Sequence, residues 1–273
     1  MKRASQILFY IVLALVIFNT TIKSSYAVPV GPTITVLGNS TKSADAATKV
    51  NSTNGTQSPG GYIFVLYIDS RQQNTRWKAY VGNVTGTLAL DDSSENTLFQ
   101  WSLTSVAGEV YATRASGDIN WSGINCTWIA DGRTNAEDGF ENSNRSPEHD
   151  ENVALSHENI NDNITATFVN TNHSSIRVGD IVIGKDECFT VQTWQNGGEQ
   201  SFSDSDNANF TQVLLYDGAF NKLDGNIVYA TEMEQDETGY RDDSTYDFQM
   251  IVPEDASLGF SGSTAYYFYV ELT

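Results

Sequence analysis

The chain has 273 residues, of which 34 are acidic and 15 basic, giving a formal net charge of −19. A chain this acidic lacks the positive surface that binds phosphate backbones, so we do not expect nucleic acid as a partner. Apolar residues make up 40% of the chain and aromatic residues 11%, which is enough to bury a core and argues against general disorder.

Residues 1–27 have the three-part pattern of a secretory signal peptide. A positive start precedes an apolar run over 7–18, and small residues stand at Ser25 and Ala27. The run is too short to span a bilayer, which takes about 20 residues. We therefore expect cleavage after Ala27, a secreted or cell-surface protein, and no transmembrane anchor. The alternative is a pilin-like leader cut near Ala4, which would keep the apolar run as an assembly helix.

Two segments precede the main domain. Residues 28–38 contain a β-branched stretch, 33–37, that we expect to be an isolated strand. Residues 39–60 hold 13 Ser, Thr, Asn or Gly among 22 positions and no aromatic residue. This composition cannot form a packed core, so it predicts a flexible linker.

Residues 61–273 predict one all-β domain. Short segments rich in Val, Ile, Thr and aromatic residues are separated by Gly, Asn and Asp, and no amphipathic helix is apparent. Such a rhythm favours a single antiparallel β-sandwich or jelly roll. The exception is 131–162, which is Asn-rich and acidic and predicts a long surface loop. The expected strands are 62–69, 76–90, 97–104, 109–113, 124–129, 163–169, 176–183, 188–194, 210–216, 226–233, 246–252 and 265–272.

Strand alternation assigns individual side chains to a core or a solvent face. It places Phe99 with Trp101 on one apolar face, and we expect Trp101 and Trp128 in the core. In 163–168 it turns Asn163 outward and the apolar residues inward.

Two cysteines, Cys126 and Cys188, form an even pair in an exported chain. An oxidising compartment favours one disulfide between them. The alternative is two separate buried thiols.

Ten Asn-x-Ser/Thr triplets follow the signal peptide and are potential glycosylation sites. Alternation also turns Asn125 and Thr127 away from the apolar face that carries Cys126, so Asn125 is expected to face solvent. The acceptors are Asn39, Asn51, Asn54, Asn83, Asn120, Asn125, Asn144, Asn163, Asn172 and Asn209.

No catalytic motif is present in the sequence. A GxSxG elbow, a complete zincin motif, a P-loop and a GxGxxG fingerprint are all missing. The three histidines, His149, His157 and His173, lie in polar segments that predict solvated loops. We therefore expect no enzyme and no cofactor.

Two kinds of ligand site remain open. Asp204, Asp206, Asp217 and Asp224 lie in oxygen-rich loop clusters that suit calcium, although none has EF-hand spacing and acidic surface turns are the alternative. Aromatic side chains can stack on sugar rings or pack in the core, and the unassigned tryptophans are Trp77, Trp121 and Trp194.

The strings at 76–86, 228–231, 246–250 and 266–270 resemble secreted surface proteins of archaea, a group with no characterised activity. The resemblance implies an exported, surface-associated protein.

The sequence thus predicts a secreted or cell-surface structural β-protein that is glycosylated and associates with itself or with other surface proteins and glycans. Residues 28–38, with Ile34 and Val36 as alternate side chains, would add as a strand to a neighbouring subunit. The alternative is a carbohydrate-binding or adhesive module that uses calcium, and a secreted glycoside hydrolase is a third class.

Overall fold

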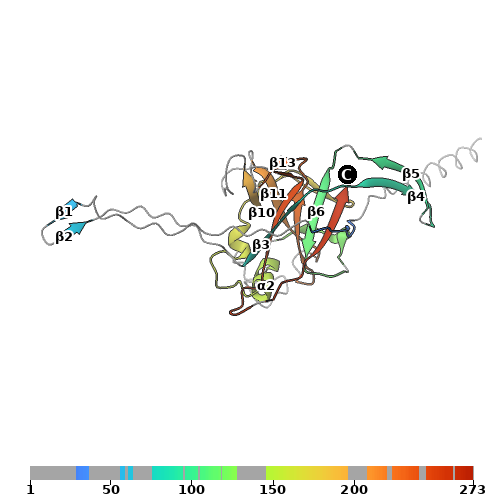
Figure 1. Cartoon of the computed structure of the whole chain (residues 1–273). Coiled ribbons are helices and arrows are strands. Elements are labelled where there is room, and N and C mark those ends of the chain that lie inside the picture. Colours follow the sequence, from blue (N-terminus) through green and yellow to red (C-terminus); the bar gives the residue numbers. More distant parts are fainter. Residues whose placement is uncertain are drawn as a thin grey trace, which may run out of the picture.

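The computed structural model describes residues 29–36, 56–58, 61–63, 76–94, 96–103, 105–117, 119–127, 146–195, 208–219, 223–239, 244–260 and 262–272. Within these stretches strands far outnumber helices, and the paired strands are antiparallel (Figure 1). The all-β prediction is confirmed.

A main sheet forms the centre of the molecule. Its strands follow the order β10, β11, β12, β6, β16, and the short β7 adds to β11. Their bounds are β6 (Gly108–Thr113), β7 (Asn125–Cys126), β10 (Thr190–Gln195), β11 (Ala208–Tyr216), β12 (Ile227–Glu232) and β16 (Tyr267–Leu272). Because β6 and β12 lie inside this order, they bury nearly every residue.

Both faces of the main sheet carry a hydrophobic core. On β11, Leu214 and Tyr216 point into one core, whereas Val213 and Leu215 point into the other. Successive residues of a strand alternate between faces, so a strand covered on both sides needs a continuous apolar run rather than an alternating one. This explains the unbroken apolar character of 213–216 and 227–230.

Short strand pairs cover the two faces. β15 (Phe248–Pro253) pairs with β3 (Trp77–Gly82) and packs on the core that contains Leu214. The hairpin of β8 (Ile176–Val178) and β9 (Ile181–Ile183) covers the core that contains Val213. The remaining pairs are β1 (Thr56–Ser58) with β2 (Gly61–Ile63), β4 (Thr87–Asp91) with β5 (Thr97–Ser102), and β13 (Glu237–Thr238) with β14 (Thr245–Tyr246).

Buried amide side chains join β15 to the main sheet. Gln212 of β11 donates its amide to the carbonyl of Ile251 at 2.7 Å and accepts from the Ile251 N–H at 2.8 Å. Gln249 of β15 donates to the carbonyl of Thr193 at 2.7 Å. These bonds pair polar groups that would otherwise be costly to bury, so the covering layer has a fixed position on the sheet.

The predicted surface loop at 131–162 is wrong for the part that the structure describes. Residues 146–162 contain α2 (Pro147–Ala154), whose start is capped by the Ser146 hydroxyl accepting from the N–H of His149. Glu148 and Asn152 on this helix are buried. Ser at the N-cap with Pro at the first helical position is a start signal that the sequence did contain. The prediction that the domain has no helix is therefore also wrong.

The predicted strand at 163–169 is instead one helical turn, α3 (Ile164–Thr167). The Asn163 side chain accepts a hydrogen bond from the N–H of Ala166 at 2.8 Å and caps that turn. Asn side chains compete in this way with the ladder bonds of a sheet. Ile164 and Phe168 are buried as expected, but Ala166 is exposed.

Several predicted boundaries also shift. The segment 76–90 forms two strands, β3 and β4, and 176–183 forms the β8–β9 hairpin rather than one strand. The expected boundary between linker and domain, at residues 60 and 61, lies inside a hairpin. β1 on one side of this boundary pairs with β2 on the other. A 3-10 turn, η2 (Trp121–Gly123), precedes β7.

A disulfide joins Cys126 to Cys188, as predicted. It links β7 to the segment before β10 across a sequence separation of 62 residues. Cys188 is fully buried beneath the β8–β9 hairpin, where its N–H donates to Nε2 of His173.

Candidate association and binding sites

The N-terminal segment 29–36 meets the outer edge of β16. Val30 and Val270 form an antiparallel bridge in which each N–H donates to the other carbonyl, at 3.0 and 2.8 Å. This register places Pro32 opposite Phe268. Proline has no N–H to donate to a ladder, so pairing stops after one bridge and 31–36 forms no strand.

The alternate side chains of this segment are uncovered. Ile34 is 60% exposed and Val36 81% exposed. An edge strand with unpaired N–H and C=O groups is a template for further strand addition. The segment therefore presents apolar side chains and backbone groups that the described part of its own chain does not use.

The β4–β5 hairpin carries a second uncovered apolar surface, and Figure 1 shows it reaching away from the main sheet. Leu88 lies opposite Trp101, and Leu90 lies opposite Phe99. These four residues share one face, which we term the hairpin apolar face. Their side chains are between 38% and 56% exposed, and the rings of Phe99 and Trp101 meet edge to face at 4.8 Å.

The alternation predicted for 97–102 is therefore right, but the core position predicted for Trp101 is wrong. No described element covers this face of the hairpin, since its four apolar residues remain exposed. Alternation is a local property of the backbone, whereas burial requires a second layer. Trp128, the other tryptophan expected in the core, lies outside the described residues.

Two of the three tryptophans that the sequence leaves open as sugar platforms, Trp77 and Trp121, pack against protein. Trp77 donates its indole N–H to the carbonyl of Asp162 at 2.8 Å and meets the ring of His157 edge to face. Trp121 packs between Tyr111 and Tyr269, with ring centroids 5.2 Å from each. The side chain of Trp194 lies outside the described residues.

Two of the three histidines are structural rather than solvated. His157 is buried, and its Nε2 lies 2.7 Å from the carbonyl of Glu254. His173 is also buried and accepts from the N–H of Cys188 at 2.9 Å. Both were expected in solvated loops, and this expectation is wrong because each ring joins segments distant in sequence.

The calcium candidates divide into two groups. Asp204 and Asp206 lie outside the described residues. Asp217 is buried, and its carboxylate accepts from the N–H and side-chain amide of Asn226. Asp224 accepts from the N–H of Ala219 at 3.1 Å. Across the described stretches, no three His, Cys, Asp or Glu side chains are grouped as metal ligands.

The sequons differ in how their asparagines are placed. Asn83 and Asn120 are exposed, whereas Asn163 and Asn172 are half-buried. Asn125 does not face solvent as expected: its amide nitrogen donates to the carbonyls of Gly123 at 2.8 Å, Tyr216 at 3.3 Å and Gly218 at 2.8 Å. Asn39, Asn51, Asn54, Asn144 and the side chain of Asn209 lie outside the described residues.

We expect Asn125→Ala to lower the free energy of unfolding by about 1–3 kcal/mol, because it leaves half-buried carbonyls without their donor. The exposed Asn83→Ala is the matched control and should change stability by less than about 0.5 kcal/mol. Urea unfolding of the unglycosylated protein measures both. Equal stability of the two variants would show that the hydrogen bonds of Asn125 do not contribute to the free energy of unfolding.

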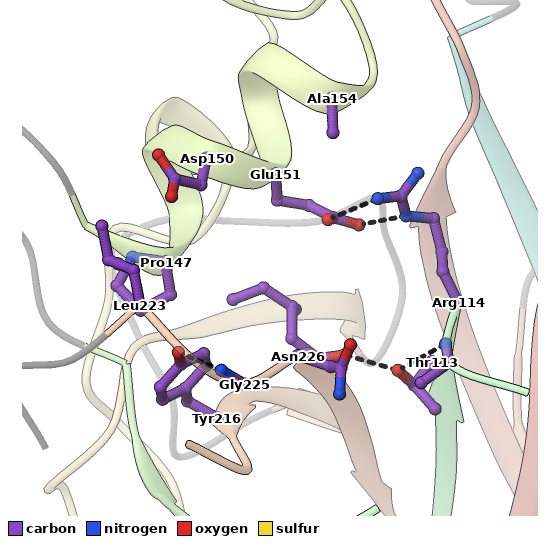
Figure 2. A pocket seen from close by; sticks show the side chains of 12 residues that line it. Thr113, Arg114, Pro147, Asp150, Glu151, Ala154, Tyr216, Leu223, Gly225 and Asn226 are labelled. Atoms are coloured by element: carbon purple, nitrogen blue, oxygen red, sulfur yellow. Dashed lines mark hydrogen bonds and ion pairs between the residues drawn. The ribbon is translucent and has the colours of Figure 1, made fainter. Parts of the chain in front are cut away.

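A hollow of about 460 Å³ lies between α2 and the ends of β6 and β12 (Figure 2). Arg114 reaches across it and binds both carboxylate oxygens of Glu151, at 2.8 and 3.0 Å. Burial raises the pKa of Glu151, against the opposing charge of Arg114. Because Glu151 already holds this guanidinium in a bidentate pair, the hollow does not offer Arg114 to an anionic ligand.

Three glutamates lie side by side at one end of the main sheet. Glu109 of β6 is directly opposite Glu232 of β12 and Glu271 of β16. Glu109 and Glu271 are buried beneath β8, where the N–H of Arg177 donates to Glu109 at 3.2 Å. Burial, with smaller contributions from the charges of Glu271 and Glu232, raises the pKa of Glu109 to about 7.

No family model, curated protein or solved structure matches the chain. Among the described helices, none is both long and apolar enough to cross a membrane.

Proposed function

We propose that this chain is a secreted, cell-surface structural β-protein that associates with copies of itself by strand addition. The observation that supports this proposal is the incomplete pairing and exposure of segment 29–36. It makes a single bridge to β16 and leaves Ile34 and Val36 exposed. An extended segment with alternate apolar side chains supplies both the main-chain bonds and the side chains that strand addition uses.

The remaining features agree with a passive structural role outside the cell. The disulfide suits an oxidising compartment, and the signal-peptide pattern of residues 1–27 suits export. Among the sequons whose asparagine side chains the structure describes, the exposed Asn83 and Asn120 are the best placed to carry glycans. The pairing of Arg114 with Glu151, and of Asp217 with Asn226, uses polar groups for structure rather than for chemistry.

Deleting residues 28–38 from the full chain is expected to convert a large assembly into a monomer, because it removes the added strand. Light-scattering mass of the protein recovered with its disulfide intact measures the change. An equally long deletion within the linker, 43–53, is the matched control and should leave assembly intact. Assembly that survives the 28–38 deletion would contradict the proposal.

A carbohydrate-binding or adhesive role is the second candidate, and one observation favours it. Phe99 and Trp101 are exposed aromatic side chains on adjacent positions of one face. Under this alternative, Trp101→Ala would abolish binding to a polysaccharide panel while leaving the fold intact. Calcium titration of the same binding tests whether a cation takes part.

A further inference from the structure

We propose, on the basis of the strand addition proposed above, that the acceptor is the β4–β5 hairpin of a neighbouring copy. Residues 33–36 of one copy would add as a third strand along an open edge of this hairpin. Ile34 and Val36 would then lie beside the hairpin apolar face and complete it.

The hairpin is an incomplete sheet. β4 and β5 pair with each other and with no other described strand. A two-stranded hairpin is marginally stable in water, whereas three strands with a hydrophobic face support one another. The turn is nevertheless well formed, because the Asp92 carboxylate accepts from the N–H groups of Ser94 and Asn96 at 2.8 and 3.0 Å. The structure thus presents an ordered template that lacks a partner.

The donor segment matches the template in pattern. Each hairpin strand contributes two apolar residues, two positions apart, to the same face. Ile34 and Val36 have the same spacing, and Thr33 and Thr35 would fall on the opposite face, where Gln100 and Ala89 lie. An added strand would therefore place two more apolar side chains beside the four that already share this face of the hairpin.

The size of the hairpin apolar face also points to an occupant. With exposed fractions between 38% and 56%, its four side chains present on the order of 400 Å² of apolar surface, which matches the largest patches on soluble monomers. Two such faces stacked together would bury on the order of 800 Å², less than a stable dimer needs. Strand addition adds main-chain hydrogen bonds to this area, so it is favoured over simple stacking of two hairpins.

The direction of the chain indicates that the segment 33–36 that pairs with a hairpin comes from a second copy and not from the same chain. Val30 runs antiparallel to β16 at Val270, so residues 31–36 head toward the Phe268 end of that strand. The hairpin leaves from the other end, where a Cβ on Gly86 would meet Leu272 at 2.2 Å. The segment of one copy therefore runs away from its own hairpin.

Charge does not oppose this contact. Residues 87–102 contain Asp91, Asp92 and Glu95 and no Lys or Arg, whereas the donor residues 33–36 carry no charged side chain. In a chain whose net charge is −19, an uncharged segment avoids the like-charge repulsion that an acidic one would meet at this hairpin.

The test uses the full secreted chain with two double variants, one for each side of the contact. Leu90→Asp with Phe99→Asp damages the acceptor, and Ile34→Asp with Val36→Asp damages the donor. Each is expected to weaken self-association at least about a hundredfold in sedimentation velocity, because charged groups replace the apolar contact. The matched controls add the same charge on the opposite faces: Ala89→Asp with Gln100→Asp, and Thr33→Asp with Thr35→Asp.

Mixing the two damaged variants gives the decisive result. The acceptor variant keeps an intact donor segment, and the donor variant keeps an intact hairpin. The mixture should therefore form one-to-one complexes and no larger oligomers. Because all four residues are exposed, the unfolding midpoint of each variant should stay at the wild-type value. This measurement separates lost association from lost folding.

The outcomes distinguish the acceptor from the strand addition itself. If the acceptor variant assembles like the wild type while the donor variant does not, the hairpin assignment is overturned and strand addition stands. If the wild type is a monomer, or if the donor variant assembles normally, strand addition fails and the hairpin assignment falls with it. Loss of association in both variants without recovery on mixing would also overturn the pairing of these two surfaces.

Discussion

Replacing both cysteines, Cys126→Ala with Cys188→Ala, is expected to lower the free energy of unfolding by about 4 kcal/mol. A cross-link spanning 62 residues restricts the unfolded chain, and the chain-entropy relation gives about 4 kcal/mol for a loop of that length. Since domains of this kind are stable by about 5–15 kcal/mol, the loss would be a large part of the total. Urea unfolding of the oxidised wild type and the double variant measures it.

Chemical reduction separates the effect of the cross-link from that of the packing around it. Cys188 is fully buried, so the double variant also removes core contacts. Reduction of the wild type with a thiol reagent opens the cross-link without replacing either side chain and should produce most of the same loss. A double variant as stable as the oxidised wild type would show that the disulfide does not stabilise this fold.

The second large effect is on pH dependence: we expect stability to fall by about 3 kcal/mol between pH 5 and pH 8. The pKa of Glu109 is raised from 4.5 to about 7 in the folded protein. Between these values the folded state keeps the proton and the unfolded state releases it. Raising the pH therefore favours unfolding. The difference between the folded and unfolded pKa values of Glu109 corresponds to a loss of about 3 kcal/mol in the free energy of unfolding. Burial also raises the pKa of Glu271, which acts in the same direction.

The variant Glu109→Gln should reduce this dependence by the part that Glu109 contributes, because glutamine stays neutral and occupies nearly the same volume. At pH 8 it is expected to be more stable than the wild type, and near pH 5 about equally stable. The exposed Glu158→Gln is the control and should keep the wild-type profile. A Glu109→Gln profile parallel to that of the wild type would assign the pH dependence to other carboxylates.

Glu109 also shows why the sequence could not indicate such a group. Nothing in Gly108 to Thr113 marks Glu109 as buried, since a glutamate at the start of a strand is normally exposed to solvent. The register of β12, β6 and β16 brings three glutamates together, and β8 then covers two of them. Register and covering layers are properties of the assembled sheet.

The β4–β5 hairpin shows the reverse case, in which residues predicted to be buried are exposed. The alternation of Phe99 and Trp101 was read correctly, yet the face that they define is uncovered. Trp101 is exposed and available to a ligand, although the strand pattern predicts a core position for it. Trp77 and Trp121, which the sequence leaves open as binding residues, are instead covered by His157 and by two tyrosines. An apolar strand face looks the same in sequence whether or not another layer packs on it.

Local signals were informative where the physics is local. Backbone alternation and β-branched composition determined the strand content, and the even pair of cysteines determined the disulfide. Ser146 and Pro147 carried a helix-start signal of the same local kind, which the acidic composition of 131–162 obscured.

An all-β chain with one disulfide is predictable from the residues alone, because strand propensity and cysteine pairing depend on residue type and spacing. Which apolar faces are buried, which polar groups are paired and which edges stay open follow from the assembled fold. These outcomes depend on contacts between segments more than a hundred residues apart, such as Val30 with Val270 and Glu109 with Glu271. No local pattern specifies those contacts.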